Sequence, residues 1–209
     1  MRSLDYMNRV EAYVNRLNSE RRTVLETIPQ VRFLDLMADE LNCNDTTTDC
    51  KEDENKKYGV APNLDAAHTR GYAKRQFVLE DCSNWPVFSC ADTWGGPDYH
   101  GIFAFSVKIT EQMKGRMIGF SLDTGADDIW NTDNPQIMVY VNGVLTCAMD
   151  LNHHEVILSD CAEPGKIYDI RLYAYVNSPG KSNFLYLKVF AKEQEAEALY
   201  YDMKLPLEA

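Results

Sequence analysis

The chain has 209 residues, of which 45% are hydrophobic and 11% aromatic, and this composition excludes a disordered chain or a fibrous repeat. The 21 Lys and Arg residues are outnumbered by 32 Asp and Glu residues, so the net charge of -11 disfavours nucleic acids and anionic lipid surfaces as partners. No apolar stretch approaches the roughly 18 residues that a membrane-spanning helix needs. We therefore expect a globular protein that binds neither nucleic acid nor membrane.

Residues 1–41 are predicted to form a helical leader. Apolar residues recur there at spacings of three and four, which is the pattern of a narrow apolar stripe on a helix: Leu4, Met7, Val10, Val14 and Leu17. Pro29 limits a second short helix that holds Val24, Leu25 and Ile28. A stripe of this kind must pack on a partner surface, which is either the rest of this chain or another chain.

Residues 42–57 are almost wholly polar and are interpreted as a solvated loop or insertion. From residue 58 to residue 192 the apolar period changes to two, as in half-buried strands. Asn142-Gly143 is the dipeptide that a type I′ hairpin turn requires, because both residues must take positive φ. Short strands separated by regular turns predict a mainly β fold, an antiparallel jelly-roll β-sandwich of galactose-binding-like shape.

Residues 193–209 change character again, are rich in Glu and Ala at first, and suit a helix or an extended exit. Because the sequence stops on apolar residues, it is interpreted as a piece of a longer protein, in which residues 193–209 would be a connector. The first residues lack the apolar core of a signal peptide, so we expect a cytoplasmic protein. Free thiols are therefore expected at all six cysteines: Cys43, Cys50, Cys82, Cys90, Cys147 and Cys161.

The richest chemical window runs from Asp92 to Gly101. Aromatic faces beside a carboxylate suit sugars, whose C–H faces stack on rings while their hydroxyls bond to oxygens. Trp94, Asp98 and His100 are therefore candidate carbohydrate or interface residues. The alternative is a loop that its tryptophan anchors to the sandwich.

A second window, residues 124–134, gathers Asp and Asn oxygens that could ligate calcium, although the spacing of an EF-hand is absent. A capped turn is the alternative, since these side chains also bond local backbone amides. Trp130 in this window is a further candidate for stacking on a sugar.

The third window, residues 150–155, supplies Asn152, His153 and Glu155 as candidate interface or sugar-binding residues. Adjacent histidines on a strand point to opposite faces, so His153 and His154 are poorly placed to share a metal ion. The cysteine pairs are too widely spaced for a usual zinc site. No nucleophile elbow or phosphate-binding loop is present, so we predict no catalytic residue, metal ligand or cofactor in this chain.

Three motifs in order resemble the N-terminal region of bacterial and cytosolic-type α-mannosidases of glycoside hydrolase family 38. They are the run from Thr93 to Phe103, the hairpin from Val139 to Gly143, and the strand entry from Asp150 to Leu158. In that family a helical leader precedes a jelly-roll domain, and the run from Glu197 to Met203 looks like the family's connector into its catalytic barrel. The resemblance extends from about Phe77 to Ala209.

The resemblance implies an accessory domain that packs on the catalytic domain of the same protein, toward which residues 193–209 lead. This chain by itself would not be an enzyme. The family's zinc ion and nucleophilic aspartate lie in the catalytic domain, so zinc is expected in the parent enzyme and no catalytic residue carries over to this chain. An autonomous module that binds mannosides is the alternative, and a self-contained hydrolase is a third hypothesis. The exposed docking face expected of such a domain also allows a homo-oligomer.

Overall fold

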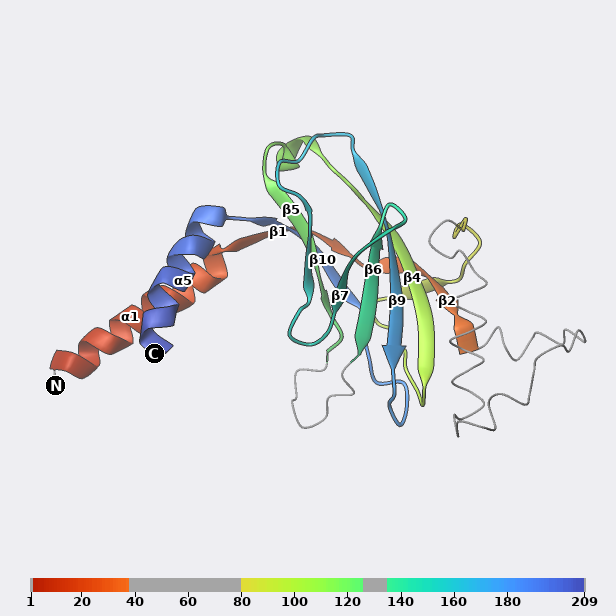
Figure 1. Cartoon of the computed structure of the whole chain (residues 1–209), viewed down its shortest axis with the longest axis horizontal. Helices are drawn as coiled ribbons and strands as arrows, with labels where there is room; N and C mark the ends of the chain where they lie inside the picture. Colours follow the sequence, from red (N-terminus) through yellow and green to blue (C-terminus); the bar gives the residue numbers. More distant parts are fainter. Residues whose placement is uncertain (1, 38–79, 126–134, 209) are drawn as a thin grey trace, which may run out of the picture.

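The computed structural model describes residues 2–37, 80–125 and 135–208, which form a β-sandwich with a pair of helices extending from it (Figure 1). The two helices come from the two ends of the described chain and are not joined by a loop; the pair is called the α1–α5 hairpin below. Helix α1 spans Arg2–Glu20 and helix α5 spans Gln194–Glu208. The other elements are β1 (Arg22–Ile28), β2 (Gln30–Asp35), β3 (Val87–Ser89), β4 (Tyr99–Lys108), η2 (Glu111–Met113), β5 (Met117–Asp123), β6 (Gln136–Val141), β7 (Val144–Met149), β8 (Glu155–Ser159), β9 (Ile167–Val176) and β10 (Tyr186–Lys192). No helix in these described ranges is long and apolar enough to cross a membrane.

Two sheets make the sandwich, one with strand order β1-β10-β5-β8 and the other with order β3-β2-β4-β9-β6-β7. All paired strands run antiparallel, which confirms the predicted antiparallel β-sandwich. Alternate residues of each strand face the space between the sheets, and their side chains form the main core. Phe103 of β4, Phe120 of β5 and Val189 of β10 are fully buried there.

The predicted Asn142-Gly143 turn joins β6 to β7. Asn142 has a φ of 51° and Gly143 a φ of 80°, as a type I′ turn requires. The Asn142 side chain is also held, because its Oδ1 accepts a hydrogen bond from the Asp169 N–H at 2.8 Å. The turn is therefore fixed both by its own dihedral angles and by its bonds to the neighbouring strand β9.

The prediction of a helical leader over residues 1–41 is wrong for residues 22–28 and 30–35, and residues 38–41 lie outside the described residues. Residues 22–28 form β1, which pairs with β10, and residues 30–35 form β2, which pairs with β4. The segment is rich in β-branched residues, and its backbone groups find partners in both sheets, β1 at the edge beside β10 and β2 between β3 and β4. The sandwich therefore begins in this segment and not at residue 58.

Helices α1 and α5 lie side by side and extend away from the sandwich (Figure 1). The apolar stripe of α1 has its partner within this chain: Val14 is 8% exposed and Tyr200 of α5 is 7% exposed. The residues after Lys192 thus form a helix, which was one of the two predicted alternatives.

Four of the six cysteines lie in the described parts of the chain. All four are free thiols: Cys82, Cys90, Cys147 and Cys161. Cys43, Cys50 and the polar residues 42–57 lie outside the described residues, so the predictions made for them stay predictions.

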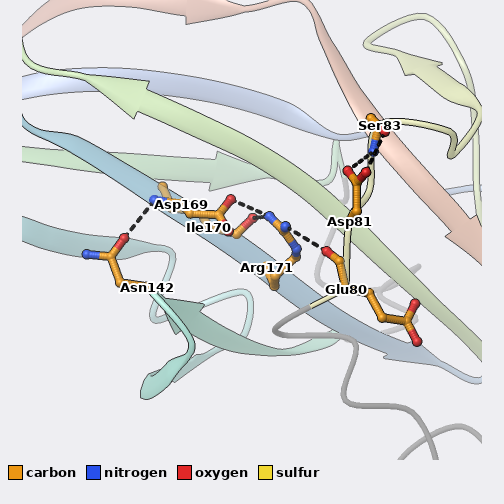
Figure 2. Close-up of polar contacts among 7 residues, drawn as sticks. All are labelled: Glu80, Asp81, Ser83, Asn142, Asp169, Ile170 and Arg171. Carbon is orange, nitrogen blue, oxygen red and sulfur yellow. Dashed lines mark hydrogen bonds and ion pairs between the residues drawn. The ribbon is translucent and has the colours of Figure 1, made fainter.

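The outer face of the six-stranded sheet carries a second apolar cluster, formed by Leu36, Trp85, Ile102, Ala104, Tyr140 and Tyr173. Arg171, only 5% exposed, fastens the segment that precedes Trp85 to this face. Figure 2 shows its guanidinium group, which pairs with Asp169, donates to the Ile170 carbonyl at 3.2 Å and reaches the Glu80 carbonyl at 3.4 Å. Both Nη atoms of this buried group thus have partners beside an otherwise apolar layer, whereas its Nε has no hydrogen-bond partner among the described residues.

Candidate functional site

Trp94, the first predicted sugar-stacking residue, is buried. Its side chain is 1% exposed, and its Nε1 donates a hydrogen bond to the Phe184 carbonyl at 3.0 Å. Its backbone forms an isolated antiparallel bridge with Asn183, with N···O distances of 2.8 and 3.1 Å. The ring cannot offer a face to a sugar at the surface, and Trp94 acts as the anchor of its loop.

The loop after Trp94 is held in an unusual backbone conformation. Gly95 has a φ of 119° and Gly96 a φ of 149°, values that side chains with a Cβ rarely allow. A Cβ on Gly95 would lie 3.0 Å from Asn183 Nδ2. Ser178 Oγ accepts a hydrogen bond from the Gly96 N–H at 3.1 Å. The turn is therefore tied to the loop that joins β9 to β10.

This turn places Asp98 beside Tyr175 at the end of the β4–β9 pair. Asp98 adopts a φ of 49°, and its N–H donates to Asn177 Oδ1 at 3.1 Å. Burial raises the pKa of the Tyr175 phenol, and the nearby Asp98 carboxylate raises that pKa further. Both side chains are half-buried, so a carboxylate and a phenol meet at the surface.

His100, the next predicted residue, lies behind this pair and is 1% exposed. Its Nδ1 is 2.7 Å from Tyr173 Oη, and its ring centroid lies 4.8 Å from that of Tyr175. The structure thus brings the predicted Asp98 and His100 together with two tyrosines of β9. His100 supports the cluster from within, because its ring is closed to solvent.

The third predicted window forms a capped turn. Asp150 Oδ1 accepts backbone hydrogen bonds from Asn152 and His153, both at 2.8 Å, and lies 3.0 Å from His153 Nδ1. These bonds, the backbone N–H of His153 first, lower the pKa of the Asp150 carboxyl. Asn152 and His153 are exposed, whereas Glu155 pairs with Arg22 of β1.

No group of three or more His, Cys, Asp or Glu side chains in the described residues could hold a metal ion. Trp130 and most of the proposed calcium window lie outside those residues. Asp123, which directly precedes the window, caps the turn at its start, since its Oδ1 accepts the Gly125 N–H at 2.7 Å.

A network of charges joins the sandwich to the hairpin. Arg21 is 9% exposed, its guanidinium carbon lies 4.3 Å from the Tyr200 ring centroid, and its Nη1 lies 3.6 Å from Glu197 Oε1. Lys192 Nζ contacts the other oxygen of Glu197 at 2.6 Å. Glu197 therefore pairs with two cations, Arg21 just before β1 and Lys192 at the end of β10.

An open cleft of about 470 Å³ lies beside this network. Charged residues at the start of β5, after β8 and around the β10–α5 junction contribute to its lining, among them Arg116, Asp160, Lys192, Glu193 and Glu195. Burial lowers the pKa of the Lys192 ammonium; Glu155 opposes this shift, and Arg22 and Arg21 add to it. Sequence reasoning missed this junction, because Arg21 is more than a hundred residues from Lys192 and Glu197 and the three residues share no motif.

The charge balance at the junction gives a testable prediction. Glu197→Gln leaves the partly buried cations Arg21 and Lys192 without their shared anion, and we expect the free energy of unfolding to fall by about 3 kcal/mol. Arg21→Met removes one cation, keeps part of the packing on Tyr200 and leaves Glu197 paired with Lys192, so a loss of only about 1 kcal/mol is expected. Urea unfolding followed by circular dichroism measures both.

Arg16→Ala is the control for these two variants. Arg16 pairs with Glu20 on α1, but the two side chains are 71% and 49% exposed. An exposed pair contributes little, so the change should stay within about 0.5 kcal/mol. A Glu197→Gln loss no larger than that of Arg16→Ala would contradict the assignment of Glu197 as the junction's central anion.

Comparisons with known proteins show no family for this chain. No model of a known protein family matches the sequence, and no curated protein matches it. Solved structures to which the chain is similar include two β-glucuronidases. One, from Ruminococcus gnavus, has a TM-score of 0.44 and 10% identity over 83% of this chain; the other, from an uncultured Clostridium species, has a TM-score of 0.45 and 8% identity over 84%.

A glycosyl hydrolase family 2 member from Bacteroides cellulosilyticus aligns with 81% of this chain, with a TM-score of 0.42 and 14% identity. The chain spans 29%, 30% and 20% of the lengths of these three proteins. None of the three is named as an α-mannosidase, and the resemblance to family 38 stays a prediction from the sequence motifs.

Proposed function

We propose that this chain is a non-catalytic accessory domain of a glycosidase and that it packs on the catalytic domain through the α1–α5 hairpin. The observation that carries the docking role is the exposure of large apolar side chains on both helices. Their exposed fractions are 42% for Met7, 62% for Tyr13, 49% for Leu199, 44% for Tyr201 and 61% for Leu205. Apolar side chains concentrated on a projecting element are typical of a protein contact surface.

The sequence motifs supply the glycosidase part of this proposal, and they name one parent in particular, an α-mannosidase of family 38. Of the described residues predicted for sugar contact, Trp94 anchors its loop, and Glu155 is ion-paired. Asn152 and His153 lie in a capped turn. That arrangement supports a structural role for the sandwich. The zinc ion of the α-mannosidase proposal would belong to a catalytic domain outside this chain.

Footprinting with hydroxyl radicals tests the docking role. The natural polypeptide that carries this chain is compared with the isolated chain. Labelling at Tyr13, Leu199 and Tyr201 should fall when the catalytic domain is present, because docking covers these side chains. Val144 and Ile167, which are 66% and 56% exposed on the sandwich, should keep their labelling and serve as internal controls. Equal labelling of the hairpin in both proteins, or a natural polypeptide without a catalytic domain, would refute the proposal.

Hydrolysis assays test the enzymatic part. The isolated chain should release no p-nitrophenol from p-nitrophenyl α-mannoside, and the natural polypeptide should release it at a rate that a zinc chelator lowers. Turnover by the isolated chain would contradict a non-catalytic domain. Turnover of p-nitrophenyl β-glucuronide in place of the mannoside would retain a glycosidase and exclude the α-mannosidase.

A module that binds mannosides is the second candidate, and the Asp98–Tyr175 pair favours it. With Trp94 buried, this pair is what remains at the surface of the predicted sugar-binding loop. Saturable binding of methyl α-mannoside that weakens in Asp98→Asn would support this function. The asparagine keeps the backbone N–H that bonds to Asn177, so the loop should persist in the variant.

A further inference from the structure

The outer face of the four-stranded sheet carries a group of polar and aromatic side chains near one end of the sandwich. Tyr186 and Lys188 of β10 point away from the core, since the intervening Leu187 is 1% exposed. Tyr186 pairs with Asp123 of β5, and Lys188 pairs with Ser121. Residues directly opposite in an antiparallel pair have their Cβ atoms about 5 Å apart. A phenol ring, a carboxylate, an ammonium group and a hydroxyl therefore share one small area of this face.

The Tyr186 ring is held in place by its neighbours. It stacks on the Phe184 ring, with centroids 5.3 Å apart and an interplanar angle of 17°. Gly125 makes room for both rings, because a Cβ there would lie 2.9 Å from Phe184 Cδ2 and 3.7 Å from Tyr186 Cε2. Phe184 is itself tied to the core, since its carbonyl accepts the Trp94 indole hydrogen bond. Tyr186 nevertheless stays 37% exposed, so it is an ordered ring that solvent can reach.

Asp123 supplies a fixed carboxylate beside this ring. Its Oδ1 accepts the Gly125 N–H at 2.7 Å, which orients the side chain, and the residue is exposed. Within the described part of the chain, this is the carboxylate's one hydrogen bond, so its second oxygen can still accept others. Lys188 is exposed in the next row of the same face and adds donors to this area.

We propose that this area binds a pyranose sugar, with the C–H face of the sugar on the Tyr186 ring and its hydroxyls bonded to Asp123 and Lys188. An ordered ring with an adjacent carboxylate matches the two faces of such a sugar, one apolar and one rich in hydroxyls. Ordering of the ring by Phe184 and Gly125 removes part of the entropy cost of binding. The inference is independent of the docking role of the hairpin, which lies at a different place on the chain.

Titrations of the whole chain test this site. Methyl α-mannoside, methyl β-glucoside, methyl β-galactoside and methyl β-glucuronide are added in turn, and binding is followed by chemical shifts in NMR spectra. At least one sugar should bind saturably, and Tyr186→Ala should weaken that binding about tenfold, the size expected for loss of one aromatic contact. Tyr186→Phe should keep most of the affinity. Asp123→Asn should lower it, although the amide oxygen still accepts the Gly125 N–H.

Two control variants make the result decisive. Tyr13→Ala removes an exposed tyrosine from α1 and should leave sugar binding unchanged. Asp98→Asn separates this site from the second candidate function. Binding lost in Tyr186→Ala and kept in Asp98→Asn supports the proposal. Binding lost only in Asp98→Asn, binding unaffected by Tyr186→Ala, or no binding of any of the four sugars overturns it, and none of these outcomes bears on docking by the hairpin.

Discussion

Replacement of Trp94 by alanine should lower the free energy of unfolding by about 4 kcal/mol, the usual cost of truncating a large buried ring. Trp94 is 1% exposed and lies against Phe103 and Tyr99, with ring centroids 5.5 and 6.3 Å away. The variant also loses the indole donor that bonds to the Phe184 carbonyl. For a chain of this size the melting temperature should fall by roughly 12 °C, as differential scanning calorimetry can measure.

Trp94→Phe separates the two contributions. Phenylalanine keeps most of the apolar volume and cannot donate a hydrogen bond to Phe184, so we expect a loss of about 2 kcal/mol. If sugar affinity is measured in Trp94→Ala, it must be compared with that of the unchanged chain at a temperature at which the variant is folded. A melting temperature unchanged in Trp94→Ala would contradict the anchoring role and would favour the alternative, a Trp94 ring that stacks on a sugar at the surface.

Gly119→Ala should be the most damaging of the glycine substitutions in the sandwich. A Cβ at Gly119 of β5 would lie 2.5 Å from the Val156 carbonyl oxygen of β8 and 2.9 Å from Phe190 Cζ of β10. The first of these atoms belongs to the backbone of a paired strand, so it cannot move without opening the sheet. Overpacking of this kind should cost on the order of 3 kcal/mol, which urea unfolding can measure.

Gly180→Ala is the matched control for this substitution. Apart from its two chain neighbours, no described residue has a heavy atom within 4 Å of the place where its Cβ would be, and its φ is outside the left-handed region. The change should stay within about 0.5 kcal/mol, as is usual for an exposed position. Similar losses in the two variants would show that the tight packing around Gly119 relaxes easily, contrary to our expectation.

The strands could be predicted from the sequence where large apolar residues recur at every second position. The alternation through Phe103 and Phe105 and the Asn142-Gly143 turn are local signals, and both correspond to the structure. The segment after Glu20 was misassigned because its short apolar spacing also fits a helix. Pairing with β10 and β4 decides its conformation, and those strands are distant in sequence.

The candidate sites were predictable only in part, for the same physical reason. Asp98 and His100 lie in one sequence window, so their proximity follows from the chain itself. The burial of Trp94 depends on Phe184 and Asn183, which lie about ninety residues further along the chain. The exposed Tyr186 carries no motif; its alternation with Leu187 indicates an outward side chain, but only the packing of Phe184 and Gly125 shows an ordered ring.

The pairing of β1 with β10 has a mechanical consequence. Helix α1 leads directly into β1, and β10 leads directly into α5. The start of β1 therefore lies beside the end of β10, where Arg22 is opposite Lys192. A force that pulls α1 and α5 apart is therefore applied to the first pair of this ladder alone. The ladder would open one pair at a time from that end, at a lower force than strands that must slide past each other. The packing of α1 on α5 and the ion pairs of Glu197 therefore stabilise the pairing of the edge strand β1 with β10.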